Sequence, residues 1–230
     1  MPSERRKVAN RTLTYFQRLL WVYVLAGALV STWGAIVVAL AFELWWSDEP
    51  ATAASLVVPA WGQRGNNLIL FVHLVTAIPP LLIGPFLFLR GLLRSKRFRF
   101  LHRWLGTIYV FAIFASTITG GILATLNRFG PVAQWGFGML AVAWFVTTYY
   151  AYRTAREKNF VRHREWMIRS FAVTLAVVAF RLLPNPEAYT MDQWYPVKTW
   201  LCWVPNLILA ECYIRITTFR GQLRRFKWLG

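Results

Sequence analysis

Long apolar segments alternate with short polar segments along the whole chain. A membrane-spanning helix needs about 20 mostly apolar residues, and six segments of the 230-residue chain meet this requirement. They cover residues 19–44, 68–89, 104–126, 132–152, 163–183 and 197–217. The pattern predicts an all-α protein, in which residues 1–230 form one integral membrane bundle of six transmembrane helices.

The lysines and arginines lie in four blocks between these apolar segments. The blocks hold Arg5, Arg6, Lys7, Arg11 and Arg18; Arg90, Arg94, Lys96, Arg97, Arg99 and Arg103; Arg153, Arg156, Lys158, Arg162, Arg164 and Arg169; and Arg215, Arg220, Arg224, Arg225 and Lys227. Cytoplasmic loops carry an excess of positive residues, and an even number of crossings returns the chain to its first side. The blocks therefore predict a protein of the inner (plasma) membrane with both termini in the cytoplasm.

The composition agrees with a membrane protein and argues against a nucleic-acid-binding one. The chain is 57% hydrophobic and only 15% charged, whereas soluble domains carry about 25% charged residues. A net charge of +17 would attract nucleic acid, but the cations are confined to the ends of the apolar segments and no nucleic-acid-binding motif is present. We expect contact with membrane lipids, including anionic headgroups on the cytoplasmic side.

Three histidines, His73, His102 and His163, lie on the small or polar stripe of a predicted helix when residues are placed at 100° intervals. Such stripes pack against other helices in a membrane. Their members are Gly106, Tyr109, Ser116 and Gly120 for His102; Met167, Ser170, Thr174 and Arg181 for His163; and Pro80 and Gly84 for His73. His102 and His163 share the cytoplasmic end, whereas His73 lies near the outer end, roughly 20 Å away along the membrane normal.

Two hypotheses about function follow from this arrangement. Two facing imidazoles at one depth can hold the iron of a b-type haem, and Gly106 would leave room beside His102 for the macrocycle. The first hypothesis is therefore an electron-transfer protein or subunit, with haem b on His102 and His163, that exchanges electrons with a quinone or another membrane protein subunit. The second is a non-catalytic membrane subunit or scaffold that binds lipid headgroups or a partner complex.

Glu211 is an acidic residue inside a predicted span, and such residues are functional candidates. Arg215 follows it at the favoured spacing for an ion pair on one helix. Alternatively, Glu211 reaches Arg169 or His163 and orients that site. Both alternatives stay open at the level of the sequence.

Arg181 and the two cysteines lie in the last two predicted spans, and neither feature requires a functional site. Arg181 lies at the outer end of the fifth segment, where an ion pair with Glu187 or Asp192 would accompany its contact with the headgroup region. Cys202 and Cys212 are on one predicted helix, roughly 15 Å apart, too far for a disulfide.

Four motifs resemble a known family. They are HRWLGTIY at 102–109, GFGMLA at 136–141 with Trp144, HREWMIRSFA at 163–172 with Arg181, and WVPNL at 203–207 with Glu211. Over about residues 68–215 the chain resembles an uncharacterised bacterial family of multi-pass membrane proteins, classed as a domain of unknown function. The resemblance implies the six-helix fold but does not point to any particular activity, and it marks as motif positions His73, His102, His163, Arg169, Arg181 and Glu211.

Overall fold

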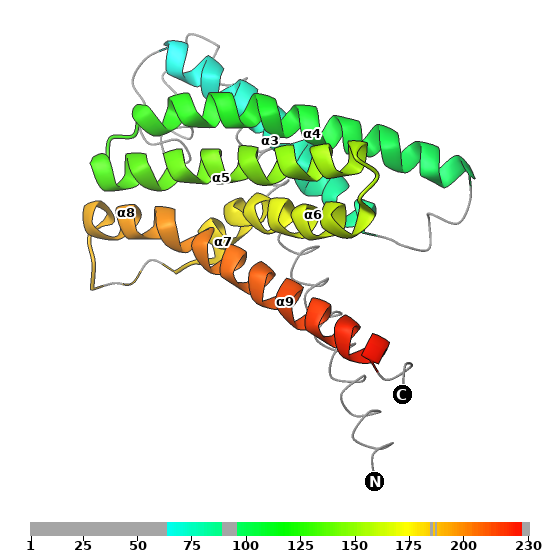
Figure 1. The fold of residues 1–230 in the computed structure, drawn as a ribbon. Coiled ribbons are helices and arrows are strands. Elements are labelled where there is room, and N and C mark those ends of the chain that lie inside the picture. The colour runs from blue at the N-terminus through cyan, green and yellow to red at the C-terminus, as the bar shows by residue number, and fades with distance from the viewer. Residues whose placement is uncertain (1–63, 89–95, 185, 187, 227–230) are drawn as a thin grey trace.

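The computed structural model describes residues 64–88, 96–184, 186 and 188–226 (Figure 1). These residues form helices and no strand: α3 (Arg64–Leu87), α4 (Lys96–Thr125), α5 (Pro131–Arg156), α6 (Phe160–Thr174), α7 (Ala176–Leu182), α8 (Met191–Leu201) and α9 (Val204–Phe226). The predicted all-α class is therefore confirmed for this part of the chain. The predicted first span, residues 19–44, lies outside the described residues.

The predicted second, third and fourth segments each form one continuous helix. Helix α4 begins at Lys96, eight residues before the predicted start at Trp104, because the basic residues of this stretch are also good helix formers. His102 consequently lies in the second turn of α4 rather than at its start. Helix α5 has Pro131 at its first position, where proline lacks only an N–H that the helix would not use.

The predicted fifth and sixth segments differ from the expectation, because each is divided into two helices. α6 ends at Thr174, whose hydroxyl donates to the Ser170 carbonyl, a back-bond that bends helices, and Leu175 separates it from α7. α8 and α9 are separated at Cys202 and Trp203. Pro205 accounts for this second break, because it has no N–H to donate to the carbonyl four residues earlier.

Hydrogen bonds between helices fix the directions in which the helices run. His73 and Thr76 of α3 contact Thr119 and Ser116 of α4, so those two helices are antiparallel. Short turns connect α4 to α5 and α5 to α6, so that α4 and α6 run in the same direction. α9 runs against α6, because Arg169 pairs with Glu211 while Glu165 accepts a hydrogen bond from Thr218.

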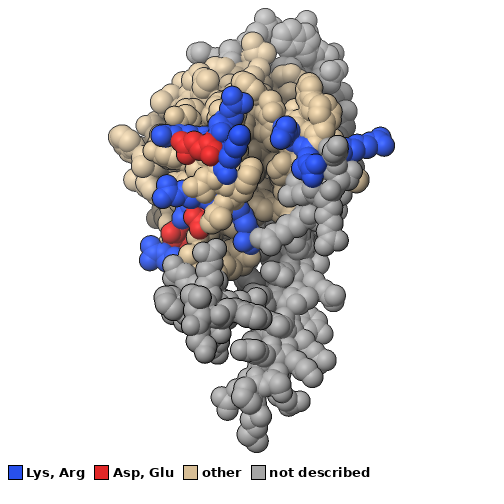
Figure 2. All heavy atoms as spheres, turned by 45° about the vertical axis from the view of Figure 1, so that its right-hand side comes forward, with Lys and Arg blue, Asp and Glu red and all other residues tan. Residues whose placement is uncertain are grey.

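These directions bring basic residues from several helices to one end of the bundle, which we call the basic end. Figure 2 shows Lys and Arg side chains gathered over this end, with few acidic ones. The described members are Arg97, Arg99 and Arg103 on α4, Arg153 and Arg156 on α5, Lys158 in the connection, Arg162, Arg164 and Arg169 on α6, and Arg215 on α9.

Large apolar side chains are exposed along the helices of the bundle. Phe111 and Ile118 on α4 are each 68% exposed and Trp135 on α5 is 66% exposed. Soluble monomers rarely expose apolar surface on this scale. Two described helical stretches, Leu68–Leu87 and Arg97–Thr125, are also long and apolar enough to cross a membrane. Both observations fit a bundle that is surrounded by lipid.

The core lies where α3, α4, α5 and α6 meet, and glycines let two of the contacts form. A Cβ atom at Gly84 of α3 would overlap the ring of Phe171 on α6. A Cβ atom at Gly136 of α5 would likewise overlap the side chain of Thr199 on α8. Small residues allow close approach of helices in membranes, and these two glycines act in that way.

Candidate functional site

Five polar side chains meet in the centre of the bundle, and we call them the central polar cluster: Tyr109, Trp144, Thr148, Ser170 and Thr174. The Tyr109 hydroxyl lies 3.0 Å from Ser170 Oγ and 3.2 Å from Thr174 Oγ1. Trp144 Nε1 donates to Thr174 Oγ1 over 2.9 Å, and Thr148 Oγ1 lies 2.8 Å from Ser170 Oγ. The cluster thus joins α4, α5 and α6.

The hydroxyl protons of this cluster can be assigned from its geometry. Thr174 donates to the Ser170 backbone carbonyl, so its Oγ1 atom only accepts from Tyr109 and Trp144. Tyr109 then donates its single hydroxyl proton to Thr174 and accepts a hydrogen bond from the Ser170 hydroxyl. The Ser170 hydroxyl in turn accepts a hydrogen bond from Thr148. Every hydroxyl is satisfied, as buried polar groups generally are.

Removal of the Tyr109 hydroxyl should destabilise the bundle. Tyr109→Phe leaves the Ser170 hydroxyl without its acceptor, and hydrogen bonds between membrane helices are worth about 1 kcal/mol. We expect a lower midpoint of thermal unfolding in detergent. Tyr152→Phe is the control, because Tyr152 is exposed on α5; equal midpoints for the two variants would contradict a structural role of the cluster.

The same cluster sets the register of the two histidines at the basic end. Tyr109 and Ser170 each follow a histidine by seven residues, His102 on α4 and His163 on α6. Seven residues are about two helical turns, so each histidine lies roughly 10 Å closer to the basic end, on nearly the same side of its helix. Because α4 and α6 run in the same direction, His102 and His163 lie at one level of the bundle.

The two imidazoles have different surroundings. His163 Nδ1 donates to the carbonyl of Ala151 on α5 over 2.8 Å, which leaves Nε2 as the atom that can bind a ligand. The His102 ring is half-buried. A Cβ atom at Gly106 would have no neighbour within 4 Å, so there is space one turn from His102 on the same helix.

His73 belongs to a separate place, the contact of α3 with α4. Its Nδ1 atom lies 3.0 Å from the Ser116 carbonyl and 3.2 Å from Thr119 Oγ1. Gly120 faces the ring so closely that a Cβ there would lie 3.0 Å from His73 Cε1. His73 is therefore a hydrogen-bonded packing residue of this contact, well away from the pair formed by His102 and His163.

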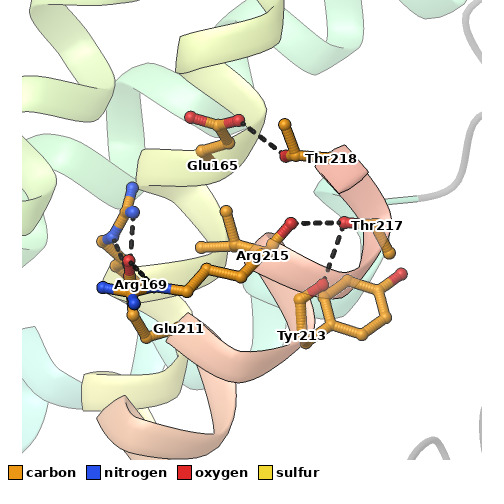
Figure 3. A network of polar contacts seen from close by, with 8 residues as sticks. Glu165, Arg169, Glu211, Tyr213, Arg215, Thr217 and Thr218 are labelled. Atoms are coloured by element: carbon orange, nitrogen blue, oxygen red, sulfur yellow. Dashed lines mark hydrogen bonds and ion pairs between the residues drawn. The ribbon is translucent and has the colours of Figure 1, made fainter. Parts of the chain in front are cut away.

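Glu211 contacts two arginines from two helices (Figure 3). Arg169 of α6 places both Nε and Nη2 on Oε2 of Glu211, at 2.9 and 2.8 Å. Arg215 of α9 lies 3.5 Å from Oε1. The structure thus contains both pairings that the sequence left open, and Glu211 does not orient His163. Among the described residues, this is the one ion pair that joins two helices.

Arg181 lies away from these sites. It is exposed on α7, although a continuous helix from His163 would have placed it on the buried stripe, and the break at Leu175 explains the difference. No ion pair joins it to Asp192 within the described part of the chain, and Glu187 lies outside that part.

Aromatic side chains close the end of the bundle opposite the basic end. Phe129 and Tyr195 stack with ring centroids 3.9 Å apart, and Phe180 meets Tyr195 edge-on. Lys198 lies 4.8 Å from the Phe180 ring centroid. Burial raises the pKa of the Tyr195 phenol, so this group stays neutral at physiological pH.

The sequence did not indicate several residues of these polar contacts, among them Thr148, Thr76 and Thr119. Thr148 is fully buried in the central polar cluster, and Thr76 accepts a hydrogen bond from Ser116. A signal for Thr148 existed: Trp144, Thr148 and Ala151 follow one another at intervals of four and three residues, which makes one face of α5.

No curated protein and no solved structure matches this chain. Among protein families, residues 70–214 match the family described as "Predicted membrane protein (DUF2306)". The match covers more than half of the chain and includes the histidines, the central polar cluster and Glu211. The chain therefore belongs to this family of predicted membrane proteins.

Proposed function

We propose that this membrane protein holds one b-type haem between His102 and His163 and exchanges electrons with a quinone or a partner subunit. When bound, the haem would supply one-electron redox chemistry. The observation that carries the proposal is the register of α4 against α6: Tyr109 and Ser170, each seven residues after a histidine, lie 3.0 Å apart, which supports a common level for His102 and His163.

The spacing of the helices also supports a planar group between the imidazoles. The whole length of the Tyr109 side chain lies between the α4 backbone and Ser170, so the two helices are held apart at this level. Two turns closer to the basic end, the proposed haem would lie between His102 and His163, and the open space at Gly106 on the His102 helix supports this placement.

Each residue of the proposed site has a distinct task. His163 is held through Nδ1 by the Ala151 carbonyl, an arrangement typical of metal-ligating histidines, which fixes the ring and aims Nε2. His102 would supply the second imidazole nitrogen that holds the haem iron. The central polar cluster keeps α4 and α6 in register, so its role in this proposal is to position the two ligands.

An absorption spectrum of the purified protein tests the proposal. The protein should be extracted in mild detergent and its spectrum recorded before and after dithionite. We expect the reduced-minus-oxidised α-band of haem b. A colourless preparation from which no haem can be extracted would reject the proposal and favour the second hypothesis, a non-catalytic scaffold.

We further propose six spans with both termini in the cytoplasm of the bacterial inner membrane. Support comes from the basic end: basic residues of α4, α5, α6 and α9 gather on one side, which is the cytoplasmic side under the positive-inside rule. A green fluorescent protein fused to the C-terminus should fluoresce, whereas an alkaline phosphatase fusion there should be inactive. The opposite result would reverse the orientation.

A further inference from the structure

The contact of Arg169 and Arg215 with Glu211 resembles an anion-binding site. Two guanidinium groups, one from α6 and one from α9, converge on a single carboxylate (Figure 3). Guanidinium groups bind carboxylate and phosphate with the same fork of N–H donors. The contact itself holds two guanidinium groups and one carboxylate, and a second carboxylate, that of Glu165, lies one turn away on α6, where it accepts a hydrogen bond from Thr218.

The two arginines differ in their exposure and in the number of contacts that they make with Glu211. Arg169 is only 17% exposed, gives two N–H groups to Glu211, and lies 4.7 Å from the centre of the Trp166 ring. Arg215 is 80% exposed and has only the single 3.5 Å contact with Glu211. Since a guanidinium has five N–H donors, Arg215 retains most of its donors for another acceptor.

Aromatic residues indicate where this place lies relative to the membrane. Trp166 stacks on Tyr150 with ring centroids 4.8 Å apart, at the basic end of α5 and α6. Tryptophan and tyrosine concentrate at the level of the lipid headgroups. Arg215 is therefore exposed at the depth at which phospholipid phosphates are found.

We infer that Arg215, with Arg169 behind it, binds the phosphate of an anionic phospholipid at the seam between α6 and α9. Glu211 limits the affinity, because its carboxylate competes for Arg215 and repels the phosphate. The site is independent of the proposed haem, since it uses neither histidine.

Retention of lipid in native mass spectrometry tests this site. The full chain in detergent would be supplied with phosphatidylglycerol or, for comparison, with phosphatidylcholine. Arg215→Ala should reduce the bound phosphatidylglycerol roughly three- to tenfold, as loss of a charge-assisted hydrogen bond implies. Glu211→Gln should increase it, because glutamine removes the competing charge and still accepts from Arg169. Bound phosphatidylcholine should respond little to either change.

Arg97→Ala is the matched control, because it removes one exposed charge from the same end on α4, away from the seam. An equal loss in Arg97→Ala and Arg215→Ala would show diffuse attraction and overturn the site. A lower retention in Glu211→Gln would overturn the competing role of Glu211. Inorganic phosphate that bound as tightly as the lipid would identify a soluble ligand and overturn the lipid assignment.

Discussion

His102→Ala and His163→Ala should each yield a protein without haem, whereas His73→Ala should retain it. A bis-histidine site loses half of its axial ligation with either substitution. His73 is bound instead to Ser116 and Thr119 in the contact of α3 with α4. The measurement is the haem content per protein, from the pyridine haemochrome spectrum of each purified variant. Haem loss in His73→Ala alone would contradict the assignment.

A substitution that keeps a ligand separates ligation from folding. His163→Met should retain the haem and raise its midpoint potential, because Met/His ligation raises the potential relative to histidine alone. A misfolded variant would lose the haem and elute as an aggregate in size-exclusion chromatography. An unchanged potential in a haem-loaded His163→Met protein would show that His163 is not a ligand.

Gly136→Ala should lower the stability of the bundle strongly for a change of one methyl group. The added Cβ would fall on the side chain of Thr199, which is fully buried and hydrogen-bonded through Oγ1 to the Pro196 carbonyl. Thr199 cannot turn aside without breaking that bond. Overpacking of this kind typically costs about 1–3 kcal/mol, and thermal unfolding in detergent should show it as a lower midpoint.

Gly138→Ala is the matched control for this prediction, two residues further along α5. A Cβ atom at Gly138 has no neighbour within 4 Å. Because alanine favours a helix over glycine by about 1 kcal/mol, Gly138→Ala should leave stability unchanged or slightly higher. If both variants unfolded at the same temperature, the packing of α8 on α5 would differ from the structure.

Helix positions followed from the sequence, but helix breaks did not. Runs of apolar residues define a span regardless of its detailed geometry, so the segments around α3, α4 and α5 were predicted well. The break at Leu175 follows the Thr174 back-bond, but Thr119 and Thr147 make the same back-bond inside unbroken helices, so this residue type does not predict a break. The break at Cys202 and Trp203 does carry a signal in Pro205, but a proline in an apolar run does not by itself predict a break, because α3 continues through Pro79, Pro80 and Pro85.

The site was predictable wherever it lay on one stripe of a helix. Tyr109 and Ser170 were on the histidine stripes, and the structure brings them together in the central polar cluster. The sequence predicts His102 and His163 at one depth, but the contact of Tyr109 with Ser170 could not be predicted, because it depends on how the side chains of α4 and α6 pack against each other. The contact of Arg169 with Glu211 was one of several alternatives, since residues 42 positions apart meet only through the tertiary fold.

The contact of Tyr109 with Ser170 also limits how early the central polar cluster can form while the chain is being synthesised. The two residues are 61 positions apart, so at 5–20 residues per second the ribosome needs about 3–12 s to make the second after the first. During that interval the nascent chain lacks both α6 partners of Tyr109. Water, a lipid or another protein must then form the hydrogen bonds of the Tyr109 hydroxyl. The contact can form only after α6 has been made, so the proposed haem would bind only after α4, α5 and α6 have come together.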